Sequence, residues 1–145
     1  MKRNLFVYGL LQHPEVLKPL IGYVPEISAA VVHDHTRRIL QHDDFEPCAV
    51  AVVESGLAIE GKILHQVPPQ AVAYLDEFEC IDRGIYARQS VISSLSCGSE
   101  VACDIYVRGP ALADSNIGGY WNQSEFNERH MEYVLTELVP RYANF

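Results

Sequence analysis

The feature that most constrains this chain is a series of short apolar runs separated by turn residues. The runs are rich in β-branched and aromatic residues, which favour strands, and glycine, proline or aspartate stands between them. They cover residues 4–8, 27–40, 48–53, 57–66, 86–95 and 100–107. Helical segments interrupt this series rather than following it. We therefore predict an α+β fold, a small mixed β-barrel in which about six strands form a strongly curved or closed sheet with flanking helices.

Turn residues set the expected connections between these strands. Glu54-Ser55-Gly56 reads as a turn, so residues 48–53 and 57–66 are expected to form a hairpin, with Gly61 marking a bulge or a close approach. Residues 27–40 fit either one long strand or a hairpin. Residues 108–120 hold one proline and three glycines, and we expect a long loop there.

Three segments have helical periodicity, namely residues 13–21, 67–79 and 123–138. Gly22 is a plausible end for the first, and the pair Pro68-Pro69 suits the first turn of the second. Asn122 and Glu125 have the spacing of a capping box at the start of the third. The inward face expected for this third helix consists of Phe126, His130, Tyr133, Val134 and Leu138.

The second helix ends with a carboxylate on its apolar side. At about 100° per residue, Glu79 lies about 40° from Leu75 at the centre of the apolar stripe, whereas Glu77 lies about 160° away. Asp76 falls at the boundary. A carboxylate on an apolar face loses hydration, which raises its pKa and suits it to accept and return a proton. A helix-end glutamate that reaches solvent or caps a neighbour has the same pattern, and periodicity does not choose between them.

Size and charge exclude several classes of protein. With 145 residues, 48% of them hydrophobic, the chain fits one compact domain over residues 1–145. Eleven basic residues against nineteen acidic ones give a net charge of -8 and no basic cluster, so nucleic acid is not an expected partner. The apolar run at residues 5–8 is too short for a signal peptide or a membrane span, so we expect a soluble, cytoplasmic protein.

Cysteines and histidines offer weaker candidates for chemistry. The cysteines show no C-x-x-C pairing and are too sparse for a disulfide scaffold, so reduced, mostly buried thiols are expected at Cys48, Cys80, Cys97 and Cys103. No histidine has a sequence position that would pair it with Cys80 as a nucleophile. His33, His35 and the cluster His42-Asp43-Asp44 have metal-ligand spacing, but they also fit solvent-facing strand residues, and we expect no metal.

Two motifs give the chain a family resemblance. Leu5-Phe-Val-Tyr-Gly-Leu-Leu11 resembles a Y-G-[S/T]-L loop, and Leu75-Asp-Glu-Phe-Glu79 followed by Tyr86-Ala-Arg88 resembles an L-D-x-x-E…Y-x-R signature. Both belong to γ-glutamylcyclotransferase-like proteins. Tyr120-Trp121 and the segment Arg129-His130-Met131 are similar to the plant AIG2-like branch of that family. The likeness covers nearly the whole chain.

The resemblance implies a small mixed β-barrel whose pocket converts γ-glutamyl amines to 5-oxoproline without a cofactor. By position Glu79 would be the acid and base, and Tyr8, Gly9, Leu10 and Leu11 would bind the substrate, the last three through backbone N–H groups. It further implies a small-molecule γ-glutamyl substrate as the partner, with no membrane, and a monomer or weak homodimer.

Several roles stay open at this point. Tyr86 is expected to pack or donate a hydrogen bond near the pocket, and Arg88 either binds a substrate carboxylate or pairs with Asp76 or Asp82. Tyr120 and Trp121 either close over the ligand or anchor the last helix.

Two departures from the family pattern supply rival functions. Leu10 stands where the family usually has serine or threonine, and Cys80 stands where glycine commonly follows the glutamate. A non-catalytic binding or regulatory module of the same fold is therefore the alternative function. A second alternative is a hydrolase or acyltransferase that uses the same carboxylate.

Overall fold

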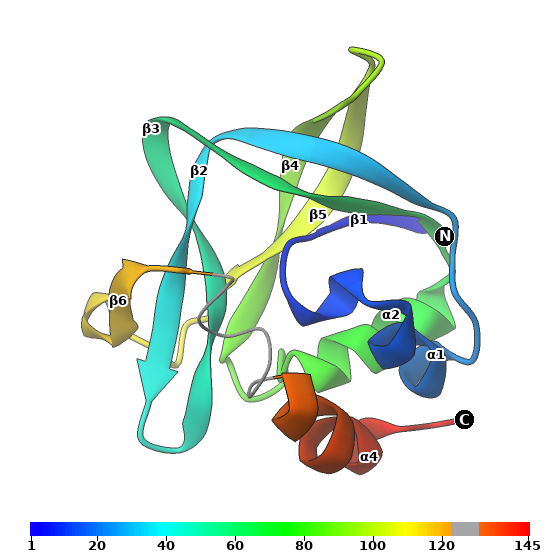
Figure 1. Cartoon of the computed structure of the whole chain (residues 1–145), viewed down its shortest axis with the longest axis vertical. Helices are drawn as coiled ribbons and strands as arrows, with labels where there is room; N and C mark the ends of the chain where they lie inside the picture. The colour runs from blue at the N-terminus through cyan, green and yellow to red at the C-terminus, as the bar shows by residue number, and fades with distance from the viewer. Residues whose placement is uncertain (123–130) are drawn as a thin grey trace.

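Five strands close into a barrel in the computed structural model, which describes residues 1–122 and 131–145. They are β1 (Arg3–Val7), β2 (Ile27–His42), β3 (Phe45–Val67), β4 (Tyr86–Leu95) and β5 (Glu100–Arg108). Around the barrel the order is β1-β3-β2-β4-β5, and β5 returns to β1. The closing pair is parallel, with Leu5 beside Asp104, whereas the other four ladders of the ring are antiparallel. The predicted mixed barrel is confirmed (Figure 1).

The strand β3 replaces the hairpin expected from Glu54-Ser55-Gly56, and that prediction is wrong. Both halves of β3 pair with β2, and the register shifts between the pairs His33–Ala58 and His35–Val53. Residues 54–57 thus form a bulge opposite Asp34, whose Oδ1 accepts the Gly56 N–H at 3.1 Å. A bulge bends its strand and increases the local twist, so these turn residues help the sheet to curl. The segment 27–40 is accordingly part of one long strand.

The sixth strand, β6 (Ile117–Tyr120), corrects the long loop expected over residues 108–120. It follows a short 3-10 helix, η2 (Asp114–Asn116), and lies along the edge of β2. The Arg38 Nε donates to the carbonyl oxygen of Gly118 at 2.8 Å, and its guanidinium lies 4.7 Å from the ring centre of Tyr120. Tertiary contacts thus hold a strand whose two glycines have little strand propensity of their own.

Close approach of β1 and β3 depends on Gly61. A Cβ at this position would stand 2.5 Å from the carbonyl oxygen of Val7 and 2.7 Å from the ring of Phe6. Real Cβ atoms do not come so near to backbone. The close approach predicted at Gly61 is confirmed.

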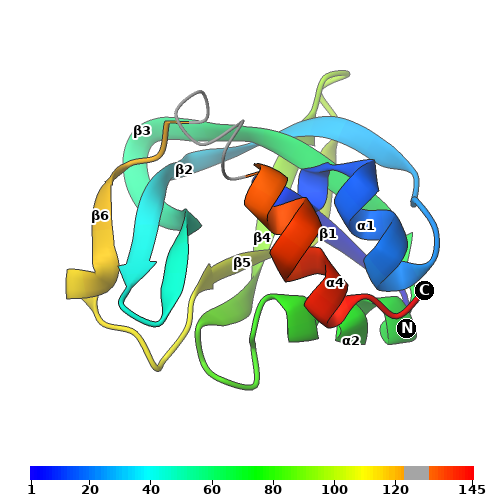
Figure 2. The same cartoon turned by 60° about the horizontal axis from the view of Figure 1, so that its bottom comes forward.

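Apart from η2, which lies next to β6, the helices of the described residues gather on one side of the barrel (Figures 1 and 2). They are η1 (Leu10–Gln12), α1 (Pro14–Ile21), α2 (Pro69–Phe78), the π-helical η3 (Val134–Leu138) and α4 (Val139–Tyr142). The first part of the predicted third helix, with Glu125, Phe126 and His130, lies outside the described residues. None of the helices in the described part of the chain is long and apolar enough to cross a membrane.

Two apolar clusters form the core. One lies beneath the helices and includes Leu17, Leu75 and Tyr106; the other fills the barrel and includes Phe6 and Ile105. The neighbouring β5 residues Ile105 and Tyr106 belong to different clusters, so both faces of β5 are buried at this point. The sequence pattern indicated only the face of Ile105. A cavity lies at the border between the two clusters.

Candidate functional site

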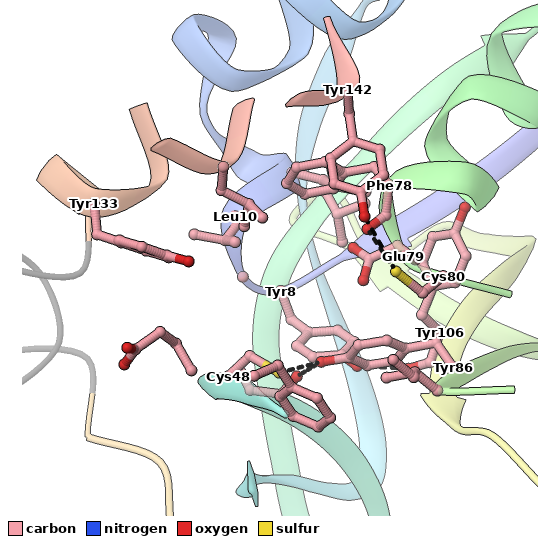
Figure 3. A pocket seen from close by; sticks show the side chains of 18 of the residues that line it. Tyr8, Leu10, Cys48, Phe78, Glu79, Cys80, Tyr86, Tyr106, Tyr133 and Tyr142 are labelled. Atoms are coloured by element: carbon pink, nitrogen blue, oxygen red, sulfur yellow. Dashed lines mark hydrogen bonds between the residues drawn. The ribbon is translucent and has the colours of Figure 1, made fainter. Parts of the chain in front are cut away.

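The candidate site is a cavity of about 220 Å³ between the barrel and the helices (Figure 3). Segments far apart in the sequence supply its walls. The turn after β1 supplies Tyr8, Gly9, Leu10 and Leu11; α2 and the residues after it supply Phe78, Glu79 and Cys80; β3, β4 and β5 supply Cys48, Ala49, Tyr86 and Tyr106; and the C-terminal helices supply Tyr133, Leu138 and Tyr142. Every sequence-predicted site residue except Arg88 lines this cavity.

The direction of Glu79 is fixed by how α2 ends. Glu79 is the C-terminal cap, the N–H of Cys80 bonds to the carbonyl oxygen of Glu77 at 3.0 Å, and the N–H of Ile81 bonds to that of Asp76 at 3.0 Å. This pair of bonds is a Schellman motif, which requires the left-handed conformation that Cys80 adopts, with φ at 55°. The Glu79 carboxylate is thereby turned into the cavity, while Glu77 is exposed.

The Glu79 carboxylate is a desolvated acid without a hydrogen-bond or ion-pair partner among the described residues. Glu79 is half-buried and lines the cavity. Burial, and secondly the charge of Asp76, raise its pKa from 4.5 to about 8. Among the described residues, no donor makes a hydrogen bond to this carboxylate, although buried carboxylates are ordinarily paired. An acid held in this way can take a proton from a ligand near neutral pH.

Three tyrosines surround Glu79 without bonding to it. The Tyr8 hydroxyl donates to the carbonyl oxygen of Tyr106 at 2.5 Å and accepts the N–H of Ala51 at 3.0 Å. The Tyr86 hydroxyl donates to the carbonyl oxygen of Ala49 at 2.5 Å. The Tyr106 hydroxyl donates to Asp76 Oδ1 at 2.8 Å. Burial is the main cause that raises the pKa of all three well above the usual value, so they remain neutral.

The turn after β1 contributes Gly9, Leu10 and Leu11 to the cavity wall. No hydrogen bond joins the N–H groups of Gly9, Leu10 or Leu11 to an acceptor among the described residues. Arg37 steadies the turn, because its Nη1 donates to the carbonyl oxygen of Tyr8 at 3.1 Å. The leucine at position 10 changes the side chain of this turn and leaves its backbone N–H groups in place.

Two of the four free cysteines line the cavity. Burial raises the pKa of the Cys48 thiol to about 12, and the Tyr86 hydroxyl lies 3.1 Å from its sulfur. The Cys80 sulfur lies 3.6 Å from the Tyr142 hydroxyl. Cys48 is thus a protonated wall residue. Of the four cysteines Cys103 is buried, Cys48 and Cys80 are half-buried and Cys97 is exposed, so the expectation of mostly buried thiols is met only in part.

Arg88 lies behind the site rather than in it. Its Nε is 3.0 Å from Asp76 Oδ1, and its Nη1 is 3.0 Å from Asp104 Oδ2. Of the two roles that the sequence left open for Arg88, the structure shows the ion pair with Asp76. The second ion pair is made with Asp104 rather than with Asp82. The substrate-binding role predicted for Arg88 has no support from the cavity lining.

Of the remaining candidates, His33, His35 and His42 do not line the cavity, whereas Asp44 does. His35 Nδ1 is 2.9 Å from the carbonyl oxygen of His33, and the His42 ring stacks on Phe45 at 5.6 Å. The part of the chain that is described holds no group of three or more histidine, cysteine or acidic residues placed for a metal. Trp121 lines the cavity, and the Tyr120 hydroxyl donates to Glu54 at 2.7 Å.

Sequence reasoning missed several lining residues. Tyr106 lies on the face of β5 that the alternating pattern assigned to solvent, and only the helices packed above it explain its burial. Tyr142 lies beyond the predicted last helix, yet its ring meets Phe78 edge-on at 5.6 Å. Scattered aromatic residues near the C-terminus, Tyr133, Tyr142 and Phe145, were the available signal, but their positions do not say which cavity they face.

Comparison with known proteins gives one consistent result. The sequence family described as "Gamma-glutamyl cyclotransferase, AIG2-like" matches residues 5–123. AIG2-like protein C of Arabidopsis thaliana is 30% identical over 92% of this chain and 74% of its own length. A second Arabidopsis thaliana protein, known from a solution structure, superposes with a TM-score of 0.67 at 27% identity, over 92% of this chain and 87% of its own. A solved gamma-glutamyl cyclotransferase shares the fold at 17% identity, with a TM-score of 0.67 over 74% and 67% of the two chains.

Proposed function

Because the chain belongs to the AIG2-like gamma-glutamyl cyclotransferase family, we propose that it converts a γ-glutamyl amine or peptide to 5-oxoproline and free amine, with Glu79 as general acid and base. The observation that carries this proposal is the Glu79 carboxylate, which has no partner within residues 1–122 and 131–145 and faces a cavity of suitable size for a small molecule. A group of this kind stays in a fold at a cost in stability, as functional groups often do.

Proton transfer is well matched in this proposal. The pKa of Glu79, at about 8, lies far closer to that of the substrate ammonium than the pKa of a free glutamate does, although the substrate's own carboxylate keeps its ammonium above the roughly 7.7–8.0 of a chain-terminal α-amino group. Moving a proton from the substrate ammonium to Glu79 then costs little free energy, and the freed amine becomes a nucleophile. An exposed glutamate, with a pKa near 4.3, would be too weak a base for this step.

The freed amine attacks the γ-carbonyl carbon, which closes the five-membered ring. A C–N bond forms, and the carbonyl electrons move to oxygen. When the tetrahedral intermediate collapses, the bond to the leaving nitrogen breaks and protonated Glu79 supplies the proton that this nitrogen needs. The ring nitrogen then gives up its extra proton, which leaves with the product amine or with solvent. Glu79 thus acts first as the base and then as the acid, and no redox step occurs.

Backbone donors of Gly9, Leu10 and Leu11 have the remaining task. They are the groups available to hold the substrate carboxylate or the developing oxyanion, and such donors act through geometry rather than through side chains. The proposal therefore tolerates Leu10. A binding module that lacks turnover, and a hydrolase that uses water as nucleophile, are the competing functions for the same cavity.

The deciding experiment is an assay for 5-oxoproline by mass spectrometry with a panel of γ-glutamyl amines and peptides. The panel should pair γ-glutamyl-lysine and glutathione with conjugates of apolar amines, because Leu138 and Phe78 give the cavity an apolar wall. Product from any substrate excludes the binding module, and release of glutamate instead of 5-oxoproline identifies a hydrolase.

Two matched variants locate the chemistry. We expect Glu79→Gln to lower turnover by about 100-fold or more, since the amide keeps the shape but cannot take a proton. Glu77→Gln, two residues away on the exposed face, should leave turnover unchanged. Near wild-type activity of Glu79→Gln would refute the assignment.

A further inference from the structure

Arg88 joins three elements behind the cavity wall. From β4 it reaches Asp76 on α2, with Nε 3.0 Å from Oδ1, and Asp104 on β5, with Nη1 3.0 Å from Oδ2. The three side chains are 27%, 20% and 12% exposed, so solvent screens this network only in part. Arg3 meets the same Asp104 Oδ2 at 3.0 Å but makes no contact with Asp76. The arginine is held from both sides.

Asp76 connects this network to Glu79. Asp76 lies in the last turn of α2 and Glu79 is the cap three residues later, a spacing at which residues are neighbours on a helix surface. A negative charge at Asp76 opposes ionisation of Glu79, and a cation paired with Asp76 reduces that opposition. The Tyr106 hydroxyl also holds Asp76 Oδ1, at 2.8 Å, so the carboxylate has a fixed position next to the helix end.

We propose that Arg88 is a positioning residue that controls the ionisation of Glu79 through Asp76, by fixing the Asp76 carboxylate and offsetting its charge. The claim concerns the free protein, and its meaning for catalysis rests on the proposed function. Arg88 does not line the cavity, so it reaches Glu79 only through another residue.

Other titratable groups also face Glu79 or share its cavity. They are Tyr8, His13, Asp44, Glu46, Cys48, Cys80, Arg83, Tyr86, Tyr106, Tyr133, Arg141 and Tyr142. Among charged groups, Asp76 is the one that raises the pKa of Glu79, after burial itself. The ion pairs of Arg88 go to Asp76 and Asp104, so Asp76 is the connection to test.

The test is a titration of the Glu79 side-chain carboxyl by ¹³C NMR in the free protein, assigned from the signal missing in Glu79→Gln. Arg88→Gln should raise the pKa of Glu79 by about one pH unit, because the charge of Asp76 loses its counterion. Arg88→Lys keeps a cation and should restore much of the wild-type value. Arg3→Gln is the matched control. Because Arg3 contacts Asp104 but not Asp76, this change should leave the pKa of Glu79 unchanged.

Asp76→Asn supplies an independent variant with nearly unchanged shape, and it should lower the pKa of Glu79. Adding Arg88→Gln to Asp76→Asn should then have little effect, since the intermediary charge is gone. The inference is overturned if Arg88→Gln leaves Glu79 unchanged, or if it shifts Glu79 equally with asparagine at position 76. Either result would leave Arg88 as an ion pair that fastens α2 to the barrel.

Activity separates this inference from the proposed function. If the titration behaves as expected but no substrate yields 5-oxoproline, the proposed function fails and the control of Glu79 by Arg88 stands. If 5-oxoproline forms, the acidic limb of kcat/KM should move to higher pH in Arg88→Gln. A raised KM with an unmoved limb would instead indicate direct substrate binding and refute the positioning role.

Discussion

At the scale of single residues, Glu79 makes stability depend on pH. Its pKa rises from 4.5 to about 8 on folding, so the folded state holds the proton more tightly than the unfolded state. The resulting stabilisation is complete below pH 4.5 and is lost as pH rises through about 8. The Glu79→Gln variant does not lose stability in this way, because glutamine does not ionise. Chemical denaturation should therefore show the variant gaining on the wild type across this interval, at a slope approaching about 1.4 kcal/mol per pH unit.

The control for this prediction is Glu77→Gln, which should track the wild type at every pH because Glu77 is exposed. A difference between Glu79→Gln and the wild type that does not change with pH would contradict the raised pKa. The same pKa predicts that kcat/KM rises with pH through about 8, where half of the base is ionised, and levels off above it.

Cys80 is the second residue with a measurable consequence. Its φ of 55° lies in the left-handed region, which costs a non-glycine residue roughly 1–2 kcal/mol. Cys80→Gly should raise the free energy of unfolding by about 1 kcal/mol, after subtraction of the flexibility that glycine adds to the unfolded chain. Thermal and chemical denaturation measure this gain.

Cys80→Ala separates the backbone from the thiol. Alanine keeps the strained conformation and loses the contact with Tyr142, so it should be no more stable than the wild type. If alanine stabilises as much as glycine does, the strain is not the cause. Both variants should retain activity, because the thiol has no part in the proposed reaction.

At the scale of elements, the turn from β1 into η1 tests the backbone cradle. A Cβ at Gly9 would lie 3.9 Å from the Cβ of Ala49, which is an ordinary contact, so a side chain fits the protein itself. Gly9→Val should nevertheless abolish ligand binding, since the added methyl groups obstruct a ligand's approach to the N–H groups. Calorimetric titration with a γ-glutamyl ligand, beside a thermal melt, distinguishes lost binding from unfolding.

Leu10→Ser is the companion change in the same turn. It leaves the backbone donors in place and restores a hydroxyl, so binding should persist and turnover should be equal or higher. Normal ligand binding by Gly9→Val would show that the anion-holding groups lie elsewhere.

The elements also show what the sequence could reveal. Periodicity placed Glu79 inward and Glu77 outward, because a helix covered on one side follows a simple rule. The same local rules read Glu54-Ser55-Gly56 as a hairpin turn, since a turn and a bulge use the same residues and differ only in which strand they pair with. Gly118 and Gly119 concealed β6, whose strand conformation comes from its contacts with Arg38 and the edge of β2. The position of Arg88 depended on the location of Asp104, which no local pattern contains.

At the scale of the whole molecule, the barrel closes through its most distant pair of strands. Leu5 lies beside Asp104 in the parallel pair of β1 and β5, and the Tyr8 hydroxyl bonds to the carbonyl oxygen of Tyr106 just beyond that pair. The site therefore cannot form before the barrel closes. Closure of such long connections is slow, typically milliseconds to seconds.

Refolding should show this dependence directly. Trp121 is the single tryptophan and lines the cavity, so its emission reports on the site. We expect recovery of Trp121 emission and of ligand binding in one common phase after dilution from denaturant, measured by stopped flow. Ligand binding that recovers before the tryptophan signal would contradict a site made by closure.

The tyrosine hydroxyls around Glu79 have a consequence for where protons can travel. Tyr8 and Tyr86 donate to backbone carbonyls, and Tyr106 donates to Asp76, so each hydroxyl hydrogen already has its acceptor. A relay passes a proton along hydroxyls that are able to turn from one partner to the next, and these three are held. These three hydroxyls therefore provide no proton-transfer path from the Glu79 carboxylate to bulk water. A proton that Glu79 takes from a ligand stays on the carboxylate until the ligand, or water entering through the open cavity, takes it back.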